Sequence, residues 1–169
     1  MRVLMLAPPG GGKGTQGVQL AEHLGVEHIS SGDLLRAAVA QDTPLGRKVN
    51  TYMQAGELAP DELVTEAIRP ILRSRDGYVL DGFPRRLAQA DGVDFDVVVF
   101  LDVPLDVVKQ RLLGRGRGDD TADVIAHRLQ EYEQDTRPLI DLYAEKGVLL
   151  RVDGDRPPDE IAAELRENV

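Results

Sequence analysis

Short apolar runs alternate along the chain with longer segments in which apolar residues recur every three or four positions. An apolar run of about four to six residues has the length of a buried strand, and the longer spacing is typical of an amphipathic helix. The pattern predicts strands at residues 2–6, 26–29, 78–81, 97–102 and 148–152. It predicts helices that end at Gly25 and that span about 32–41, 44–55, 60–75, 104–113, 120–146 with a break at Pro138, and 158–167. Strands that alternate with helices indicate an α/β fold with a parallel sheet.

One segment departs from this alternation, because residues 30–59 contain two predicted helices and no strand between them. We interpret the segment as an insertion between the second and third strands. The chain has 169 residues, of which 42% are hydrophobic and 29% are charged. This length and composition are typical of one globular domain, here residues 1–169.

The composition argues against a membrane-spanning, disulfide-bonded or nucleic-acid-binding protein. The longest strongly apolar run, Val97–Leu101, is far shorter than the roughly 20 residues that cross a bilayer. The chain has no cysteine, which excludes disulfides and thiolate metal sites. The formal net charge of −9 argues against nucleic-acid binding driven by overall charge. We therefore expect a cytoplasmic monomer without a membrane or nucleic-acid partner.

The loop after the first predicted strand has the composition of a phosphate cradle. Its residues are Gly10, Gly11, Gly12, Lys13, Gly14 and Thr15. Glycines let backbone N–H groups approach a phosphate, the dipole of the following helix favours an anion, and the lysine adds a positive charge. The Thr15 hydroxyl suits a phosphate-bound Mg²⁺, as does Asp81 at the end of the third predicted strand. An incidental glycine turn is the alternative, and the position between a strand and a helix argues against it.

Several spaced segments resemble the motifs of adenylate kinases, in the order in which that family carries them. They are the phosphate loop at residues 9–16, the monophosphate-site motifs at 29–36 and 56–58, the Asp-Gly-Phe-Pro-Arg signature at 81–85 with Gln89, the lid segment at 111–120, the helix arginine Arg128 and the ATP-base loop at 152–154. The resemblance covers nearly the whole chain. Motifs that recur in the right order are more specific than any one of them.

The resemblance implies the P-loop nucleoside monophosphate kinase fold, with three α/β/α layers around a five-stranded parallel sheet. The implied parts are a core at residues 1–29, 60–111 and 122–169, a helical monophosphate-binding insertion at 30–59, and a very short lid at 112–121. The implied activity is reversible, Mg²⁺-dependent, in-line phosphoryl transfer, ATP + AMP = 2 ADP, which maintains adenine nucleotide balance. ATP, AMP and ADP are then the partners. Because the lid has no cysteine, no structural zinc is implied.

The resemblance also assigns site residues, motif by motif. Catalytic roles fall to Lys13, Arg85, Arg117 and Arg128, of which Arg117 and Arg128 close on the transferring phosphoryl group. ATP binding falls to the phosphate loop and to Arg111, Arg115 and Arg156. AMP binding falls to Ser31, Arg36, Glu57, Leu58, Ala59, Gly82, Arg85, Gln89, Arg117 and Arg128. Thr15 and Asp81 are the implied Mg²⁺ residues, acting through water.

Two alternatives stay open at the level of the sequence. A UMP/CMP kinase of the same fold is disfavoured by Gln89, whose donor and acceptor suit the edge of adenine, whereas pyrimidine-specific relatives tend to carry Asn there. A catalytically inactive nucleotide-binding regulator is favoured by Ala7, which stands where the first glycine of the phosphate-loop pattern belongs, and by the short lid. The complete set of site arginines argues against an inactive protein.

Some polar residues have structural explanations that compete with functional ones. His23, His28 and His127 lack the spacing of a metal site or a catalytic base, and we interpret them as structural. Asp119 and Asp120 suit ion pairs with Arg115 or Arg117 in the lid, and Asp120 also suits an N-cap.

Overall fold

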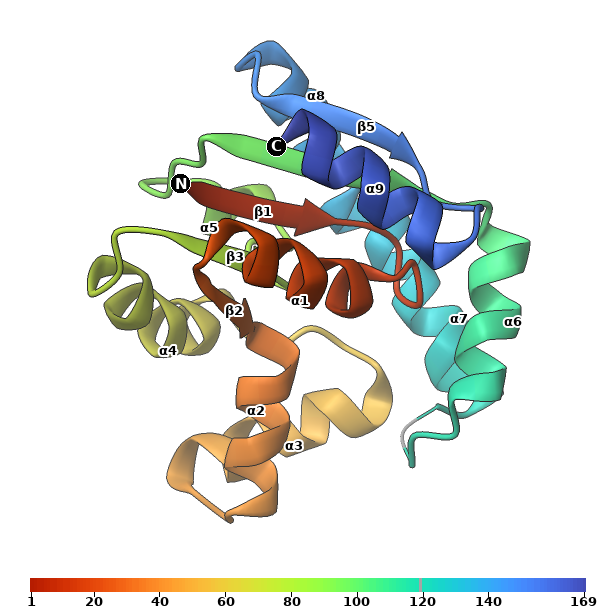
Figure 1. Ribbon diagram of the computed structural model, residues 1–169. Coiled ribbons are helices and arrows are strands. Elements are labelled where there is room, and N and C mark those ends of the chain that lie inside the picture. The colour runs from red at the N-terminus through yellow and green to blue at the C-terminus, as the bar shows by residue number, and fades with distance from the viewer. Residues whose placement is uncertain (119) are drawn as a thin grey trace.

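A five-stranded parallel sheet forms the centre of the computed structural model, which describes residues 1–118 and 120–169 (Figure 1). The strands are β1 (Arg2–Leu6), β2 (Glu27–Ser30), β3 (Tyr78–Asp81), β4 (Val97–Asp102) and β5 (Leu149–Asp153). Their order is β2-β3-β1-β4-β5, and every neighbouring pair is parallel. The five predicted strands and the α/β class are confirmed. Because the strands are parallel, the loops that follow them meet at one edge of the sheet.

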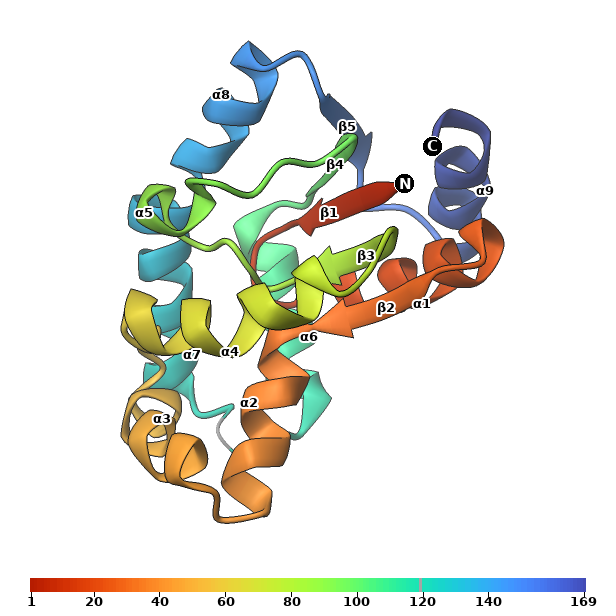
Figure 2. The same cartoon turned by 90° about the vertical axis from the view of Figure 1, so that its left-hand side faces the viewer.

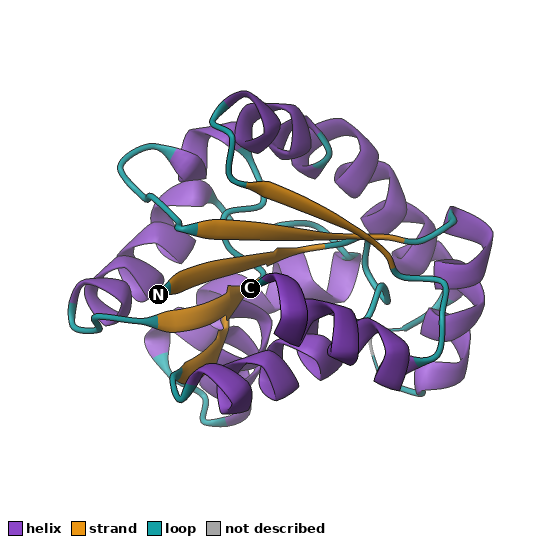
Figure 3. Ribbon diagram, turned by 45° about the horizontal axis from the view of Figure 1, so that its top comes forward, coloured by secondary structure: helices purple, strands orange, loops and turns teal. Residues whose placement is uncertain are grey.

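Helices cover both faces of the sheet, which gives three layers (Figure 3). Side chains of β1 alternate between the faces: Val3 and Met5 belong to one buried cluster, and Leu4 and Leu6 belong to the other. The helices that contribute to the first cluster are α1 (Lys13–Leu24) and α9 (Pro158–Asn168). Those that contribute to the second include α4 (Asp61–Arg73) and α8 (Pro138–Glu145). A short helix that the pattern does not predict, α5 (Leu87–Ala90), carries Gln89.

The insertion consists of two helices, α2 (Ser31–Ala40) and α3 (Pro44–Ala55), which extend away from the sheet (Figure 2). The Thr43 hydroxyl accepts a hydrogen bond from the Gly46 N–H at 3.0 Å and so caps α3. A Cβ atom on Gly46 would lie 2.1 Å from the carbonyl oxygen of Ala38. The two helices therefore approach as closely as a glycine allows.

The segment expected to form a lid begins within a helix. The helix expected at about 104–113 continues beyond its predicted end, since Gly114 and Arg115 belong to the last turn of α6 (Leu105–Arg115). Gly116, with φ 71°, ends this helix. Asp119, the first of the two expected lid aspartates, lies outside the described residues.

The long helix predicted after the lid is divided, as the position of Pro138 suggested. Helix α7 (Ala122–Glu131) begins after Thr121, whose hydroxyl accepts a backbone N–H of the first turn at 3.3 Å. Thr121, and not Asp120, is therefore the cap. A π-helical turn, η1 (Tyr132–Thr136), leads from α7 to the helix that begins at Pro138.

The close approach of α2 and α3 generates a stability prediction. Gly46→Ala places a methyl group against the Ala38 carbonyl, and overpacking of this kind is expected to lower the free energy of unfolding by about 1–3 kcal/mol. Urea denaturation of the purified variant measures the change.

Gly114→Ala is the matched control for Gly46→Ala. Gly114 has helical backbone and no atom within 4 Å of its Cβ position. Alanine there is expected to be neutral or to stabilise the fold by up to about 1 kcal/mol. A Gly46→Ala protein as stable as the parent would contradict the close approach of the two helices.

Candidate active site

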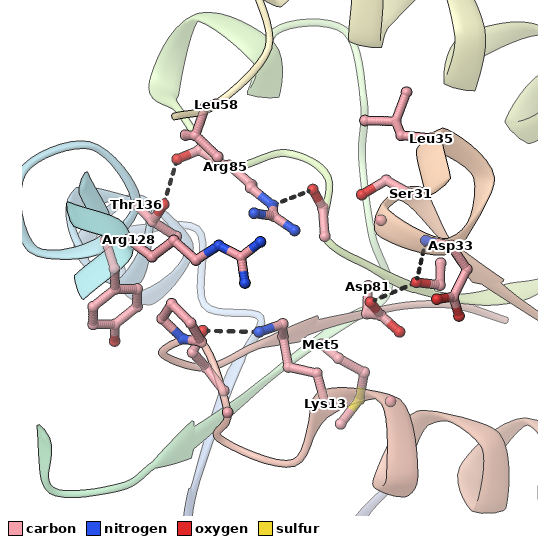
Figure 4. Close-up of a pocket in the computed structure, with 18 of the residues that line it drawn as sticks. Met5, Lys13, Ser31, Asp33, Leu35, Leu58, Asp81, Arg85, Arg128 and Thr136 are labelled. Atoms are coloured by element: carbon pink, nitrogen blue, oxygen red, sulfur yellow. Dashed lines mark hydrogen bonds between the residues drawn. The ribbon is translucent and has the colours of Figure 1, made fainter. Parts of the chain in front are cut away.

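A cavity of about 850 Å³ opens at the edge of the sheet where the parallel strands end. The phosphate loop, the start of α2, residues 56–59, the segment after β3, and the facing ends of α6 and α7 all contribute to its wall. Figure 4 shows the side chains of Lys13, Arg85 and Arg128 pointing into this space. Of the residues that the sequence assigns to nucleotide or metal binding, the cavity brings together all except Gly11 and Arg156.

The wall of the cavity is basic although the chain is acidic. Among the described residues, the seven cationic lining side chains are Lys13, Arg36, Arg85, Arg111, Arg115, Arg117 and Arg128. The four acidic ones are Asp33, Glu57, Asp81 and Glu131. The formal net charge of the whole chain is −9. Positive charge is therefore concentrated where an anion would bind.

Residues of the phosphate loop and the segment before it form hydrogen bonds with one another. Lys13 Nζ donates to the carbonyl oxygens of Ala7 and Pro8 at 3.3 and 3.4 Å. Gly12, with φ 93°, precedes α1 in a left-handed conformation that favours glycine. The N–H of Gly11 donates to the Pro8 carbonyl at 2.9 Å, so this amide is occupied within the loop. Ala7 is buried and gives its carbonyl to the lysine, a contact that needs no glycine.

The Lys13 ammonium has an unusual electrostatic environment. Its burial, together with the charge of the nearby Arg85, lowers the pKa of Lys13 to about 8, while the Asp81 carboxylate opposes the shift. A phosphate group would add negative charge beside the ammonium. Its binding should therefore raise the pKa of Lys13 and lead to proton uptake near pH 8.

Asp81 is held by residues of the neighbouring strand. Its two carboxylate oxygens contact His28 Nε2 at 2.6 Å and Ser30 Oγ at 3.2 Å. Burial alone would raise the pKa of this carboxyl, but the hydrogen bond from His28 and the charge of Lys13 outweigh it and hold the pKa below its usual value. Asp81 is therefore ionised and fixed in orientation. The expectation that His28 is structural missed this contact with a site residue.

Arg85 is anchored by the backbone around it. Its Nε donates to the Gly82 carbonyl at 2.9 Å, and its own carbonyl accepts the Thr136 hydroxyl at 2.7 Å. Burial and the charges of Arg128 and Arg36 lower the pKa of Arg85. Gly82 has φ 84°, and a Cβ there would lie 2.2 Å from Ser31 Oγ, so only glycine fits between these residues.

Asp120 joins α6 to α7 through two arginines that line the cavity. Its carboxylate accepts two hydrogen bonds from Arg115, both at 2.7 Å, and one from Arg128 at 3.2 Å. The side chain is only 1% exposed. Burial raises the pKa of Asp120, but the hydrogen bond and charge of Arg115 overcome this and lower it. The ion pair expected between Asp120 and Arg115 is confirmed.

The part of the cavity next to the insertion carries the residues expected to bind a monophosphate. Ser31 and Gln89 are each 2% exposed, and both line the wall. Arg36 forms an ion pair with Asp33 one turn earlier in α2. The segment Glu57–Ala59 crosses from α3 to α4 along the same wall.

Of the two arginines expected near the ATP base, Arg111 lines the cavity and Arg156 does not. Arg111 Nη2 donates to the Gly154 carbonyl at 3.3 Å and faces the cavity. Arg156 pairs with Glu164 and donates to the Asp153 carbonyl at 3.1 Å, and it does not line the cavity. The sequence did not indicate the ion pair between Arg156 and Glu164, because this pair depends on how α9 packs against the rest of the chain.

Glu131 is a cavity residue that the motifs did not indicate. It accepts a hydrogen bond from the Leu58 backbone, and burial raises the pKa of its carboxyl. Its Oε2 is buried with no hydrogen-bond partner among the described residues. The only available signal was its position one turn after Arg128, which places both side chains on one face of α7.

Comparison with known proteins agrees with the geometry. The family model of adenylate kinase matches residues 5–148. The chain belongs to the adenylate kinase family. It is 47% identical to adenylate kinase 1 of a Nostoc species, with 98% of this chain and 96% of the relative covered. It is 46% identical to the adenylate kinase of Nocardia farcinica, with 95% and 94% covered, and 44% identical to that of Thermus thermophilus, with 97% and 94% covered. The expected adenylate kinase activity and enzyme class, a nucleoside monophosphate kinase, are confirmed.

The described part of the chain contains neither a membrane-spanning helix nor a cluster of metal-ligating side chains. No helix there is long and apolar enough to cross a membrane. No group of three or more His, Cys, Asp or Glu side chains within it is arranged to hold a metal ion. The cytoplasmic location and the monomeric state stay predictions.

The environment of Lys13 predicts a proton linked to ATP binding. At pH 8.5 a lysine with a pKa of about 8 is mostly neutral, and the triphosphate is expected to bind its protonated form. Titration calorimetry in buffers of different ionisation enthalpy should detect uptake of about half a proton or more at pH 8.5, and almost none at pH 6.5.

Lys13→Gln retains a polar side chain, one atom shorter than that of lysine, which cannot titrate. It should bind ATP more weakly and take up no proton at pH 8.5. Uptake that persists in Lys13→Gln, or that is absent from the parent protein, would contradict the assignment of a lowered pKa to Lys13.

Proposed function

We propose that this adenylate kinase catalyses the reversible, Mg²⁺-dependent reaction ATP + AMP = 2 ADP. The observation that carries the proposal is one cavity that the phosphate loop, Arg85 and Gln89 line together. A direct transfer needs the acceptor oxygen in line with the γ-phosphorus and positive charge around the transferring group, with little covalent work from the protein. A cavity with seven described cationic side chains suits this task.

The triphosphate site in this proposal is the phosphate loop with the arginines of α6. Backbone N–H groups of the loop and Lys13 hold the β- and γ-phosphates, and Arg115 contacts the phosphates from the lid side. Arg111 stacks on the base beside Gly154, which the contact between these two residues supports. Arg156 lies outside the wall, so its contact with ATP is the least supported of these assignments.

The monophosphate site lies between the insertion and β3. Arg36 and Arg85 grip the phosphate of AMP, and Gln89 reads the adenine edge. Ser31, Gly82 and the segment 57–59 shape the wall around the nucleoside, which their place in the lining supports. Arg117, which follows α6, and Arg128 on α7 close on the transferring phosphoryl group and neutralise its charge.

Mg²⁺ is proposed to bind through water to Asp81 and Thr15. Both residues line the cavity, and an ionised carboxylate with a hydroxyl is an oxygen-only donor set that Mg²⁺ prefers. Asp81 retains acceptor capacity beyond its contacts with His28 and Ser30. When bound with ATP, Mg²⁺ neutralises phosphate charge and orients the triphosphate. The residues present therefore fit the ion.

We further propose a division into a core at residues 1–29, 60–111 and 122–169, a monophosphate-binding insertion at 30–59, and a lid at 112–121. The outward extension of α2 and α3 in Figure 2 supports the first boundary. The lid consists of the last turn of α6 and the short connection to α7, and it supplies Arg115 and Arg117.

A coupled assay of ATP, AMP and Mg²⁺ tests the reaction directly. Formation of ADP should cease with EDTA and fall at least about 100-fold in Lys13→Ala, because the lysine supplies charge to the phosphates. Lys48→Ala, an exposed lysine on α3, is the control and should retain full turnover. Equal use of CMP or UMP as acceptor would overturn the AMP assignment. Nucleotide binding without turnover would favour the alternative of a catalytically inactive nucleotide-binding regulator.

The arginines around the transferring group should matter for rate far more than for folding. Arg117→Ala and Arg128→Ala are expected to lower kcat by about 10³-fold, the lower range for an arginine that stabilises phosphoryl-transfer charge. Steady-state kinetics and thermal melts measure both effects. Arg47→Ala, which removes an exposed pair with Asp42, is the control. Near-parental kcat in a folded Arg117→Ala protein would contradict its role.

A further inference from the structure

The amide of Gln89 is held at both of its ends. Its Oε1 accepts the backbone N–H of Arg85 at 2.7 Å, and its Nε2 donates to Asp61 Oδ1 at 2.8 Å. Gln89 is 2% exposed, so water has little access to loosen these bonds. Helices α4 and α5, which carry Asp61 and Gln89, pack side by side.

These two partners determine which way the amide faces. A backbone N–H can only donate, and an ionised carboxylate can only accept. Turning the amide by 180° would place NH₂ against the Arg85 N–H and a carbonyl oxygen against the Asp61 carboxylate. Both contacts would then be repulsive, at separations of 2.7 and 2.8 Å between heavy atoms. The observed orientation is the one that satisfies both partners.

The held amide has one acceptor site and one N–H left for a ligand. The adenine edge offers an amino group at C6, which donates, and N1, which accepts, so it matches an acceptor beside a donor. Hypoxanthine offers a carbonyl oxygen at C6 and an N1–H, which is the reversed pair. Hypoxanthine would be matched by the opposite orientation of the amide, which Asp61 opposes.

Asp61 is itself anchored. It is the first residue of α4, where the helix dipole favours a negative charge. Arg86 Nη1 donates to the same Oδ1 at 3.3 Å, and Arg86 also approaches Asp135 at 3.7 Å. The carboxylate is thus fixed by groups that do not line the cavity.

We propose that Asp61 is a specificity-determining positioning residue, which holds the Gln89 amide in the orientation that selects a 6-aminopurine acceptor over a 6-oxopurine one. This inference rests on the proposed function, in which Gln89 reads the acceptor base. Asp61 touches neither nucleotide and acts through Gln89 alone.

The test compares AMP with IMP as acceptor in Asp61→Asn. Asparagine has nearly the same shape but can either donate or accept, so one of the two restraints on the Gln89 orientation is lost. The ratio of kcat/KM for AMP to that for IMP should fall about tenfold, as expected for the loss of one charge-assisted restraint. The ratio is insensitive to the fraction of folded protein, and a merely structural role would leave it unchanged.

Glu62→Gln is the matched control, since it removes a carboxylate charge from the same first turn of α4 at an exposed side chain and leaves the contact between Asp61 and Gln89. Its AMP-to-IMP ratio should equal that of the parent protein. In a Gln89→Met background, Asp61→Asn should cause no further change in the ratio.

An unchanged ratio in Asp61→Asn would overturn the proposal. The same tenfold fall in the Gln89→Met background would also overturn it, because Asp61 would then act by another route. If the parent protein uses IMP as well as AMP and Gln89→Met changes nothing, the assignment of Gln89 to the acceptor base fails, and the role of Asp61 fails with it. If that assignment holds, Gln89→Met alone lowers the parental ratio.

Discussion

Crowded positive charge at the carboxyl edge of the sheet is the constraint on which the rest of this structure depends. Parallel strands bring the phosphate loop, Asp81 and the following Arg85 to one edge, and α6 and α7 add further arginines. Burial, together with the repulsion between these cations, lowers the pKa values of Lys13, Arg85 and Arg117. An anion with several negative charges relieves this repulsion, so the site is electrostatically prepared for polyphosphate.

Two carboxylates, Asp81 and Asp120, balance part of this positive charge. Asp81 lies on the sheet side, where His28 and Ser30 fix it, and its charge opposes the loss of the proton from Lys13. Asp120 lies between α6 and α7 and bonds to Arg115 and Arg128. It thereby links arginines of two helices that line the cavity.

Much of this arrangement is predictable from the sequence, and the exceptions share a cause. Strand positions, the break at Pro138 and the position of the phosphate loop follow from local patterns of apolar residues, proline and glycine. The bond from His28 to Asp81 depends on the register of β2 against β3, which no local pattern determines. The contact between Asp61 and Gln89 depends on the packing of α4 against α5, and the Arg156 pair depends on α9. Helix α6 was expected to end at about residue 113 but continues through Gly114 to Arg115, whose side chain bonds to Asp120 near the start of α7, a contact that no local pattern indicates.

A structure with a bisubstrate analogue, two adenosines joined by five phosphates, tests the central claim most directly. Lys13 Nζ now lies within 3.3–3.4 Å of two carbonyl oxygens of its own loop. The account predicts that Nζ leaves them for the phosphates, that Arg85, Arg117 and Arg128 surround the central phosphate, and that Asp120 keeps its bonds to Arg115. A bound analogue with Lys13 still on the Ala7 and Pro8 carbonyls, or with the central phosphate away from these arginines, would contradict it.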